Sequence, residues 1–409
     1  MIVRYAVKCE TCGQPHTVRI GMGHDETQTH KFLCRGCSEE IVLRMKLNHA
    51  QLSWEVKCVE NCSAVDEVAG APIVNVDAIF PIPPELQGLD TVFPRFAYSH
   101  DMYEAAKRAG SVVDASALPA DALNRRPYRP PDYAAEWRLL SRAWSLAQNG
   151  NVALSEKRIA EASAKLYPHD PLENLQDWVW RLALFLTNPH YHLIFDRAMR
   201  AIGRMDKPEL APDFAHYYET VAKERATRYF NVFKNFYTGY GELSQVYFFA
   251  SKGMVIPEGH KTTSIDFDAV AMFYGNTYED FTILIDYLAM WNNMLQGRRY
   301  DTFAKMNLGF YHTLDRPKRF DAFASNPTFM AICEERDNKI RNASHHRWFV
   351  LDKASQIVRY RAGKSGSGPE QTISYVGYLE RCARLFSQTI TLLRLELMIS
   401  NIMGTSYSV

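Results

Sequence analysis

The segment 337–348, DNKIRNASHHRW, sets an arginine beside an asparagine and follows them, after two small residues, with two adjacent histidines. Histidine exchanges protons near neutral pH, arginine stabilises charge on a phosphate, and asparagine can orient an oxygen. Because RNA carries its own nucleophile, the 2′-hydroxyl, a site that polarises the phosphate and manages protons can cleave it without a metal. The same residue types also cap and solvate ordinary helix ends, so the segment alone leaves both interpretations open.

The residues that lead into this segment predict one helix over 329–346, because the stretch contains neither glycine nor proline. Residues four apart lie on one face of a helix, which places Arg341 and His345 together. We expect Glu335 and Asp337 to restrain the arginine in the absence of substrate. The apolar residues expected to point to a core are Phe329, Ile332, Cys333 and Ile340.

The run RNASHH resembles the R-x4-6-H motif of the HEPN superfamily (higher eukaryotes and prokaryotes nucleotide-binding), in which a polar residue commonly follows the arginine. Arg341 and His346 fit the motif with four residues between them, and Asn342 is the polar residue. His345 falls one residue short of that spacing and is kept as the alternative to His346. The resemblance covers roughly residues 210–405, a helical region that carries the motif late and closes with a long helix.

Active members of this superfamily are metal-independent ribonucleases that dimerise, so that two motifs face each other across one cleft. The resemblance implies a C-terminal helical bundle, an RNA substrate, a homodimer, and cleavage that leaves a 2′,3′-cyclic phosphate and a 5′-hydroxyl. It assigns Arg341 to phosphate binding, Asn342 to positioning, and His346 or His345 to proton transfer. Many members are toxins or antiviral effectors, and we expect such a role here, with a regulatory protein as a further partner.

Two other functions fit the same sequence. The helical region can be inactive and hold a partner or a nucleotide, with the N-terminal ribbon docking on nucleic acid. The chain can also be a structural subunit of a larger complex. Cleavage of RNA in the presence of excess chelator distinguishes the first interpretation from these two.

Cysteine spacing marks a second candidate site, near the N-terminus. Cys9 and Cys12 form one C-x2-C pair, Cys34 and Cys37 form another, and 21 residues separate the pairs. This spacing is typical of a single structural Zn²⁺ bound by four thiolates. Glycines at 13 and 36 supply the backbone freedom that such tight turns need. Alternating apolar residues around the pairs predict β-hairpins, and thus a small β-rich zinc ribbon.

Cys58 and Cys62 form a third pair, with three residues between them. They are either half of a second metal site, completed by His24, His30 or His49, or two plain thiols near the base of the ribbon. We expect no second metal.

The remaining pattern is mainly α-helical and divides the chain into four regions. They are the zinc-ribbon-like head (1–65), an irregular proline-containing connection (66–132) with one short helix near 101–110, a helical middle region (133–210) and a HEPN-like helical domain (211–409). Helices are expected over 133–148, from Ser155, over 172–187, over 213–251, and from the caps Asp266 and Asp268 to Gly297. Two short strands around a Gly/Ser turn precede a final helix. Its single apolar stripe contains Tyr375, Leu379, Cys382, Phe386, Ile390, Leu393 and Leu397.

Composition excludes several classes of protein. The chain has 409 residues, 47 basic and 46 acidic, so no global charge attracts it to nucleic acid or to anionic membranes. Any nucleic-acid site must therefore be local. The N-terminus lacks a secretory signal pattern, and the apolar stretch near the C-terminus is interrupted by Arg394 and Glu396. We expect a cytoplasmic protein that does not span a membrane, with reduced cysteines.

Overall fold

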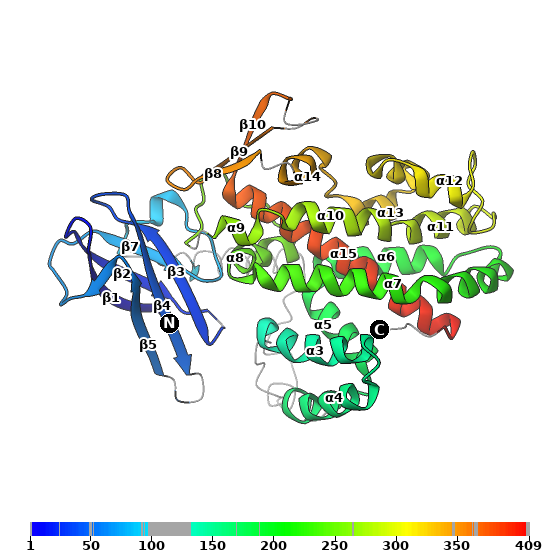
Figure 1. Cartoon of the computed structure of the whole chain (residues 1–409), viewed down its shortest axis with the longest axis horizontal. Helices are drawn as coiled ribbons and strands as arrows, with labels where there is room; N and C mark the ends of the chain where they lie inside the picture. Colours follow the sequence, from blue (N-terminus) through cyan, green and yellow to red (C-terminus); the bar gives the residue numbers. More distant parts are fainter. Residues whose placement is uncertain are drawn as a thin grey trace, which may run out of the picture.

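The computed structural model describes residues 2–23, 25–48, 51, 53–90, 93, 95–96, 132–168, 170–187, 189–263, 266–345, 348–361, 363 and 367–405. It contains a β-rich N-terminal part, called the head below, and a larger helical body (Figure 1). This agrees with the expected mainly α class and its small β-rich N-terminus. The short helix expected near 101–110 lies outside the described residues. No helix in the described ranges is long and apolar enough to cross a membrane.

Two sheets form the head. Their strands are β1 (Ile2–Cys9), β2 (Pro15–Gly21), β3 (Thr27–Leu33), β4 (Glu40–Asn48), β5 (Ser53–Glu60), β6 (Cys62–Ala64) and β7 (Ile73–Asp77). One sheet has the order β6-β1-β2-β7, and the other is the antiparallel meander β3-β4-β5. Alternating residues such as Val7, Val18, Leu43 and Val76 are buried in one core between them. The last strand, β7, pairs in parallel with β2, so the sheet continues past residue 65 into the connection.

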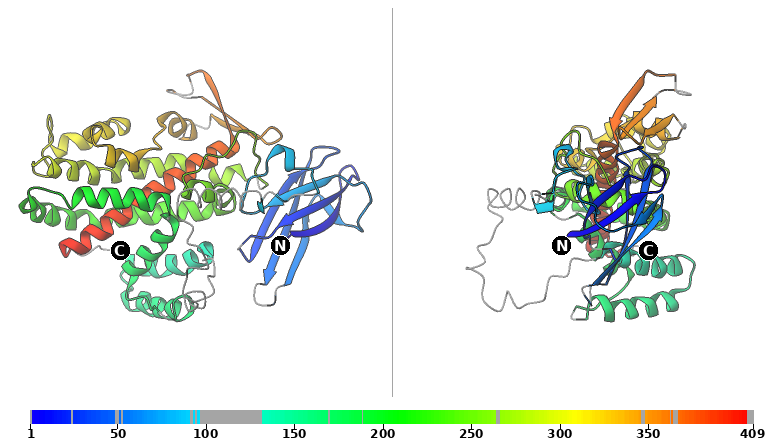
Figure 2. Two further views of the ribbon diagram at one scale, coloured as in Figure 1. Left: turned by 180° about the vertical axis from the view of Figure 1, so that it is seen from behind. Right: turned by 90° about the vertical axis from the view of Figure 1, so that its left-hand side faces the viewer.

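The body is built from helices joined by short connections. They are α3 (Tyr133–Gln148), α4 (Val152–Leu166), α5 (Leu175–Thr187), α6 (His190–Ile202), α7 (Ala211–Thr238), α8 (Tyr240–Ser251), α9 (Phe267–Val270), α10 (Phe273–Leu284), α11 (Asp286–Leu295), α12 (Leu308–Thr313), α13 (Pro327–Met330), α14 (Asn338–His345) and α15 (Tyr375–Met403). The 3-10 helices among the described residues are η1 (Pro84–Leu86), η3 (Pro208–Leu210), η4 (Arg316–Phe323) and η5 (Ala331–Cys333). A small sheet, β8 (Phe349–Asp352), β9 (Ile357–Arg361) and β10 (Glu370–Ser374), projects from the body above α15 (Figure 2).

The closing helix α15 is the centre of the body. It packs against α5, α6, α7, α8 and α10, and runs obliquely through the bundle in Figure 1. The expected apolar stripe is buried, but so are polar residues on its other faces, including Gln388, Arg394 and Glu396. The expectation of one apolar face was therefore wrong, because neighbours surround this helix on all sides. One core includes residues from both helical regions that the sequence analysis separates at residue 210.

Several expected helices are shorter or divided. The stretch 213–251 breaks at Gly239 into α7 and α8, and the helix expected to end at Gly297 consists of α9, α10 and α11. Local signals were more accurate: the expected cap Asp266 accepts a hydrogen bond from the amide of Ala269 at the start of α9, and Gly297 adopts a positive φ of 71°. Asp268 is not a cap, because it lies inside α9. Ser155 does not begin a helix. It lies inside α4, where its hydroxyl donates to the carbonyl of Ala143.

A buried ion cluster joins α15 to α7 and α11. Glu396 on α15 is fully buried, and its carboxylate accepts hydrogen bonds from the guanidinium of Arg225 and from the hydroxyls of Tyr218 and Tyr229. These three donors occupy one face of α7. Arg225 also pairs with Asp286, the first residue of α11. Burial raises the pKa of Asp286, but Arg225 and His312 together outweigh this effect and lower it overall. Arg225 thus lies between the carboxylates of Asp286 and Glu396.

Replacing Glu396 with alanine is expected to lower the free energy of unfolding by about 3–5 kcal/mol, because Arg225 and two tyrosine hydroxyls lose a buried partner. Urea unfolding followed by far-UV circular dichroism measures this. The control is Glu161→Ala, which removes a half-exposed ion pair with Arg158 and should cost less than about 1 kcal/mol. A similar small loss for both variants would contradict the structural role given to Glu396.

Candidate functional site

The four cysteines of the two C-x2-C pairs come together in the head. The Sγ atoms of Cys9, Cys12, Cys34 and Cys37 all lie within 4.8 Å of one another, close enough to hold one metal ion. The distance from the Cys9 sulfur to the Cys37 sulfur is 3.8 Å, and from the Cys12 sulfur to the Cys34 sulfur it is 3.5 Å. Each pair spans the end of one strand, β1 or β3, and the turn that follows it.

The two turns, 9–14 and 34–39, repeat the same hydrogen-bond pattern. In each, the amide of the first cysteine donates to the carbonyl five residues later, and the amide four residues later donates back to that cysteine's carbonyl. The fifth residue of each turn adopts a positive φ, 77° at Gly13 and 62° at Ser38. Glycine therefore meets a real conformational need at 13. Gly36 serves differently, because an added Cβ would lie 3.2 Å from the Cys12 sulfur.

Burial and hydrogen bonding act against each other at Cys9. Burial disfavours its thiolate, but hydrogen bonds from the backbone amides of Cys12 and Thr11, together with those of the Cys34 and Cys37 side chains, outweigh this effect and lower the pKa of the thiol to about 7. The first turn thus favours the ionised form at Cys9, whereas burial raises the pKa of Cys34. Asn61 supports it from the neighbouring strand connection, because its side-chain oxygen accepts hydrogen bonds from the amide and hydroxyl of Thr11.

Cys58 and Cys62 lie outside the cluster. Cys62 is buried in β6 opposite Cys9, and burial together with the neighbouring Cys58 raises the pKa of its thiol to about 12. Of the histidines suggested as further ligands, His24 and His49 lie outside the described residues, and His30 is fully buried in β3. Within the described part of the chain, the four sulfurs form the one metal-sized group of histidine, cysteine and carboxylate ligands.

The second candidate site lies on α14. The segment 329–346 is not one helix: α13 ends at Met330, η5 ends at Cys333, and α14 begins at Asn338. Side chains from other helices hold the intervening backbone. Gln388 on α15 exchanges two hydrogen bonds with the backbone of Glu335, and the hydroxyl of Tyr274 on α10 accepts a hydrogen bond from the amide of Asp337. These long-range bonds replace the helical ones.

One face of α10 supports α14. Tyr274 and Tyr278 are four residues apart, as are Gly275 and Glu279, and all four lie toward α14. Gly275 permits the closest approach: a Cβ there would lie 2.5 Å from the Ser344 hydroxyl oxygen. The absence of a side chain at 275 is therefore what lets the two helices pack together.

Arg341 is held by α10. Its guanidinium forms an ion pair with Glu279 and donates a hydrogen bond of 2.7 Å to the side-chain oxygen of Asn342. Arg316, from η4, pairs with the other oxygen of Glu279 at 3.2 Å. The side chains of all three charged residues are partly exposed, between 27% and 30%. Two arginines therefore share one carboxylate at the surface, which leaves a local excess of positive charge.

The expected partners of Arg341 bind a different arginine. Asp337 pairs with Arg381 of α15 at 2.8 Å, and Glu335 lies 3.7 Å from the same guanidinium. The expectation that these two carboxylates restrain Arg341 was wrong. Nothing in the sequence around Glu279 or Arg316 marks them as partners of Arg341, because the pairing depends on how α10, η4 and α14 pack.

Of the two adjacent histidines, the structure describes only His345. The Nε2 atom of His345 is buried beside Gly275 and has no hydrogen-bond partner among the described residues. Its ring therefore packs toward α10 rather than toward solvent. His346 lies outside the described residues. The structure brings Arg341 and Asn342 into contact, and it places His345 on the same helix against α10.

Replacing Cys34 with serine is expected to reduce bound metal from one equivalent per chain to well below one, because three thiolates and a hydroxyl hold metal far less tightly than four thiolates. Elemental analysis of the purified protein measures this. Cys58→Ser is the matched control and should retain the full equivalent, since Cys58 lies outside the cluster. A full equivalent in Cys34→Ser would exclude the four-sulfur site.

Replacing Gly275 with alanine is expected to lower the free energy of unfolding by about 1–3 kcal/mol, because the new methyl group forces α14 away from α10. Gly241→Ala in α8 is the control: an added Cβ there meets nothing within 4 Å, so the better helix former should be neutral or stabilising by up to about 1 kcal/mol. Thermal unfolding of both variants tests the contact. Equal stability would show that α14 does not depend on it.

Comparison with known proteins identifies no relative: no protein-family model, curated protein sequence or solved structure matches this chain.

Proposed function

We propose that this protein is a metal-independent RNA endonuclease of HEPN type that acts as a toxin or antiviral effector. The observation that carries the proposal is the Arg341–Asn342 pair, partly exposed on α14 beside a second arginine. The motif resemblance gives these residues a role, and a mainly helical body suits the bundle that the resemblance implies. The substrate would be attacked by its own 2′-hydroxyl, leaving a 2′,3′-cyclic phosphate and a 5′-hydroxyl.

Each residue has a chemical role in this proposal. Arg341 binds the scissile phosphate and stabilises the charge that develops on it, for which its fork of N–H donors is suited. Asn342 orients the guanidinium through their hydrogen bond. Glu279 holds Arg341 in one position until a phosphate competes for it. His346 transfers the proton, because the Nε2 atom of His345 is buried against α10.

A nearby sheet face supports binding of single-stranded RNA. Trp348 and Val350, at the start of β8, are 47% and 62% exposed. Arg359 lies directly opposite Val350 on β9, and the amide of Arg361 donates to the carbonyl of Trp348. An exposed aromatic ring with two arginines offers base stacking and phosphate contact together. This face begins three residues after α14 ends, so it is close to the proposed cleavage site.

The resemblance also implies a homodimer, in which the arginine and histidine of both protomers act across one cleft. In the same proposal the head is a zinc ribbon. A tetrahedron of four sulfurs at a zinc–sulfur distance of about 2.3 Å has edges of about 3.8 Å, and the Cys9–Cys37 sulfur distance is 3.8 Å. The zinc is structural and takes no part in cleavage. We propose the cytoplasm as the location and a regulatory protein as a further partner.

One observation favours the alternative, a non-catalytic protein that binds nucleic acid or a partner. Arg341 is already paired with Glu279, and His345, the alternative to the motif histidine, packs into the protein. A site without an accessible imidazole binds phosphate but has no group suited to proton transfer near neutral pH. The function of His346 decides between the two.

Cleavage of RNA in excess chelator tests the proposal. Wild-type protein should produce 5′-hydroxyl ends, and Arg341→Ala should reduce the rate by about 10²–10³-fold through loss of charge stabilisation. His346→Ala should lose a factor of about 10²–10⁴, whereas His345→Ala should mainly lower stability. The matched control is Arg336→Ala, an exposed arginine just before α14, whose rate should be unchanged.

The outcomes are distinct. Equal activity in wild type and Arg341→Ala would reject the assigned site. RNA binding without cleavage by the folded dimer would favour the non-catalytic alternative. Sequencing of the 5′-hydroxyl ends formed in cells would then identify the RNA that is cut.

A further inference from the structure

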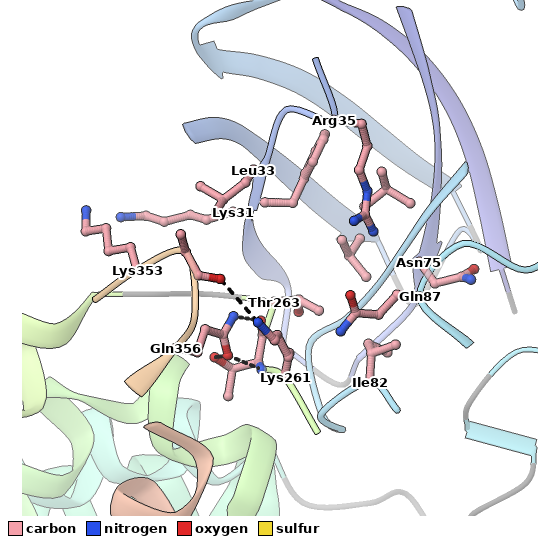
Figure 3. Close-up of a pocket in the computed structure, with 15 residues that line it drawn as sticks. Lys31, Leu33, Arg35, Asn75, Ile82, Gln87, Lys261, Thr263, Lys353 and Gln356 are labelled. Atoms are coloured by element: carbon pink, nitrogen blue, oxygen red, sulfur yellow. Dashed lines mark hydrogen bonds between the residues drawn. The ribbon is translucent and has the colours of Figure 1, made fainter. Parts of the chain in front are cut away.

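A pocket of about 130 Å³ lies where the head meets the body. Its head side is formed by β3, the second cysteine turn and β7, and its body side by residues 261–263 and 353–356. Figure 3 shows Arg35 on one side, Lys261 and Gln356 facing it, and Lys31 and Lys353 together at one edge. We call this the junction pocket.

Every charged residue that lines the junction pocket is a cation. They are Lys31, Arg35, Lys261 and Lys353, brought together from positions spread along most of the chain. No carboxylate is among the described lining residues. Glu40 lies beside the edge, 3.7 Å from the Nζ atom of Lys31 and 3.6 Å from that of Lys353. Glu40 therefore offsets part of the positive charge at this edge, whereas the lining itself carries four cations.

The two inner cations are positioned but not neutralised. The ammonium of Lys261 donates to the carbonyls of Ala354 and Ser355, both at 3.2 Å, which leaves its full charge and one further N–H. The guanidinium of Arg35 has no ion pair with any described residue. Its backbone is held in place, because its amide donates to the Nε2 atom of the buried His16 at 3.0 Å.

Backbone pairing between head and body keeps the pocket in shape. The amide of Lys31 donates to the carbonyl of Thr263, and the Thr263 hydroxyl donates to the carbonyl of Asp77. Ile82 and Lys261 form an antiparallel bridge. The side chain of Gln356 both accepts from and donates to the backbone of Thr262. The cations are thus presented by ordered backbone from both parts.

We propose that the junction pocket binds a phosphate group, carried by a polynucleotide or by a free nucleotide. Lysine and arginine from four separate segments provide the donors that a phosphate oxygen prefers. The pocket's size suits a phosphate with part of its sugar rather than a duplex. A neighbouring hollow shares Lys31 and Lys353 and reaches Ser344 of α14, but Asp266 and Asp268 also line it, so its charge favours a phosphate less than that of the junction pocket does. Binding itself does not depend on catalysis at Arg341.

Fluorescence polarisation measures binding of phosphate-containing probes to the full-length Arg341→Ala protein. This variant is used so that the RNA probe is not cut. The result can then be interpreted even if the nuclease proposal fails. The probes are a fluorescent single-stranded RNA and a fluorescent ATP analogue. The double change Arg35→Gln and Lys261→Gln should weaken binding of one or both probes by about tenfold. For RNA, the slope of log K against log salt should fall by about 1.4, at about 0.7 per phosphate contact.

The control is Lys318→Ala, which removes an exposed cation outside the pocket lining and should leave both affinities unchanged. Lys353→Gln, a 55% exposed side chain, provides a second variant that does not disturb the packed junction. Loss of RNA binding alone identifies a polynucleotide, and loss of ATP binding alone identifies a free nucleotide. Unchanged affinity for both probes in the double variant and in Lys353→Gln overturns the proposal.

Discussion

Glu396 is the constraint around which the body is arranged. A fully buried carboxylate must be paired, and α7 supplies Arg225, Tyr218 and Tyr229 from one of its faces. This fixes the rotation of α7 against α15, and the second ion pair of Arg225 brings the start of α11 to the same point. Helix packing by apolar side chains alone tolerates sliding and rotation, whereas these directional bonds do not.

The candidate site on α14 depends on that arrangement. α10 precedes α11 in the chain and packs against both α7 and α15, so it presents Tyr274, Gly275 and Glu279 in a definite direction. α14 is only eight residues long, too short to be stable by itself. It is held by the Tyr274 hydroxyl at its start and by close packing at Gly275. Arg341 is therefore positioned by a neighbouring helix rather than by its own.

The head and body keep separate apolar cores, apart from Phe80, which follows β7 and packs against Phe248 and Phe249 of the body. Hydrogen bonds also join the two parts, because Thr263 bonds to Lys31 and Asp77 and Lys261 pairs with Ile82. A polar junction of this kind can leave cations exposed to solvent between two rigid parts. A phosphate bound there would contact both the head and the body. Occupancy of the junction pocket would therefore be coupled to the position of the head relative to the body.

Local features of this protein could be predicted from its sequence. The two C-x2-C pairs indicated the metal-sized cluster, Asp266 and Gly297 marked helix ends, and Phe329, Ile332 and Ile340 were recognised as core residues. Each of these features depends on a few neighbouring residues, because their spacing determines a turn or one face of a helix. The break before α14, the burial of α15 on all sides, the Arg341–Glu279 pair and the junction cations depend on contacts between distant segments. The sequence does not encode those distances locally, so only the tertiary structure decided which carboxylate Arg341 pairs with and where His345 points.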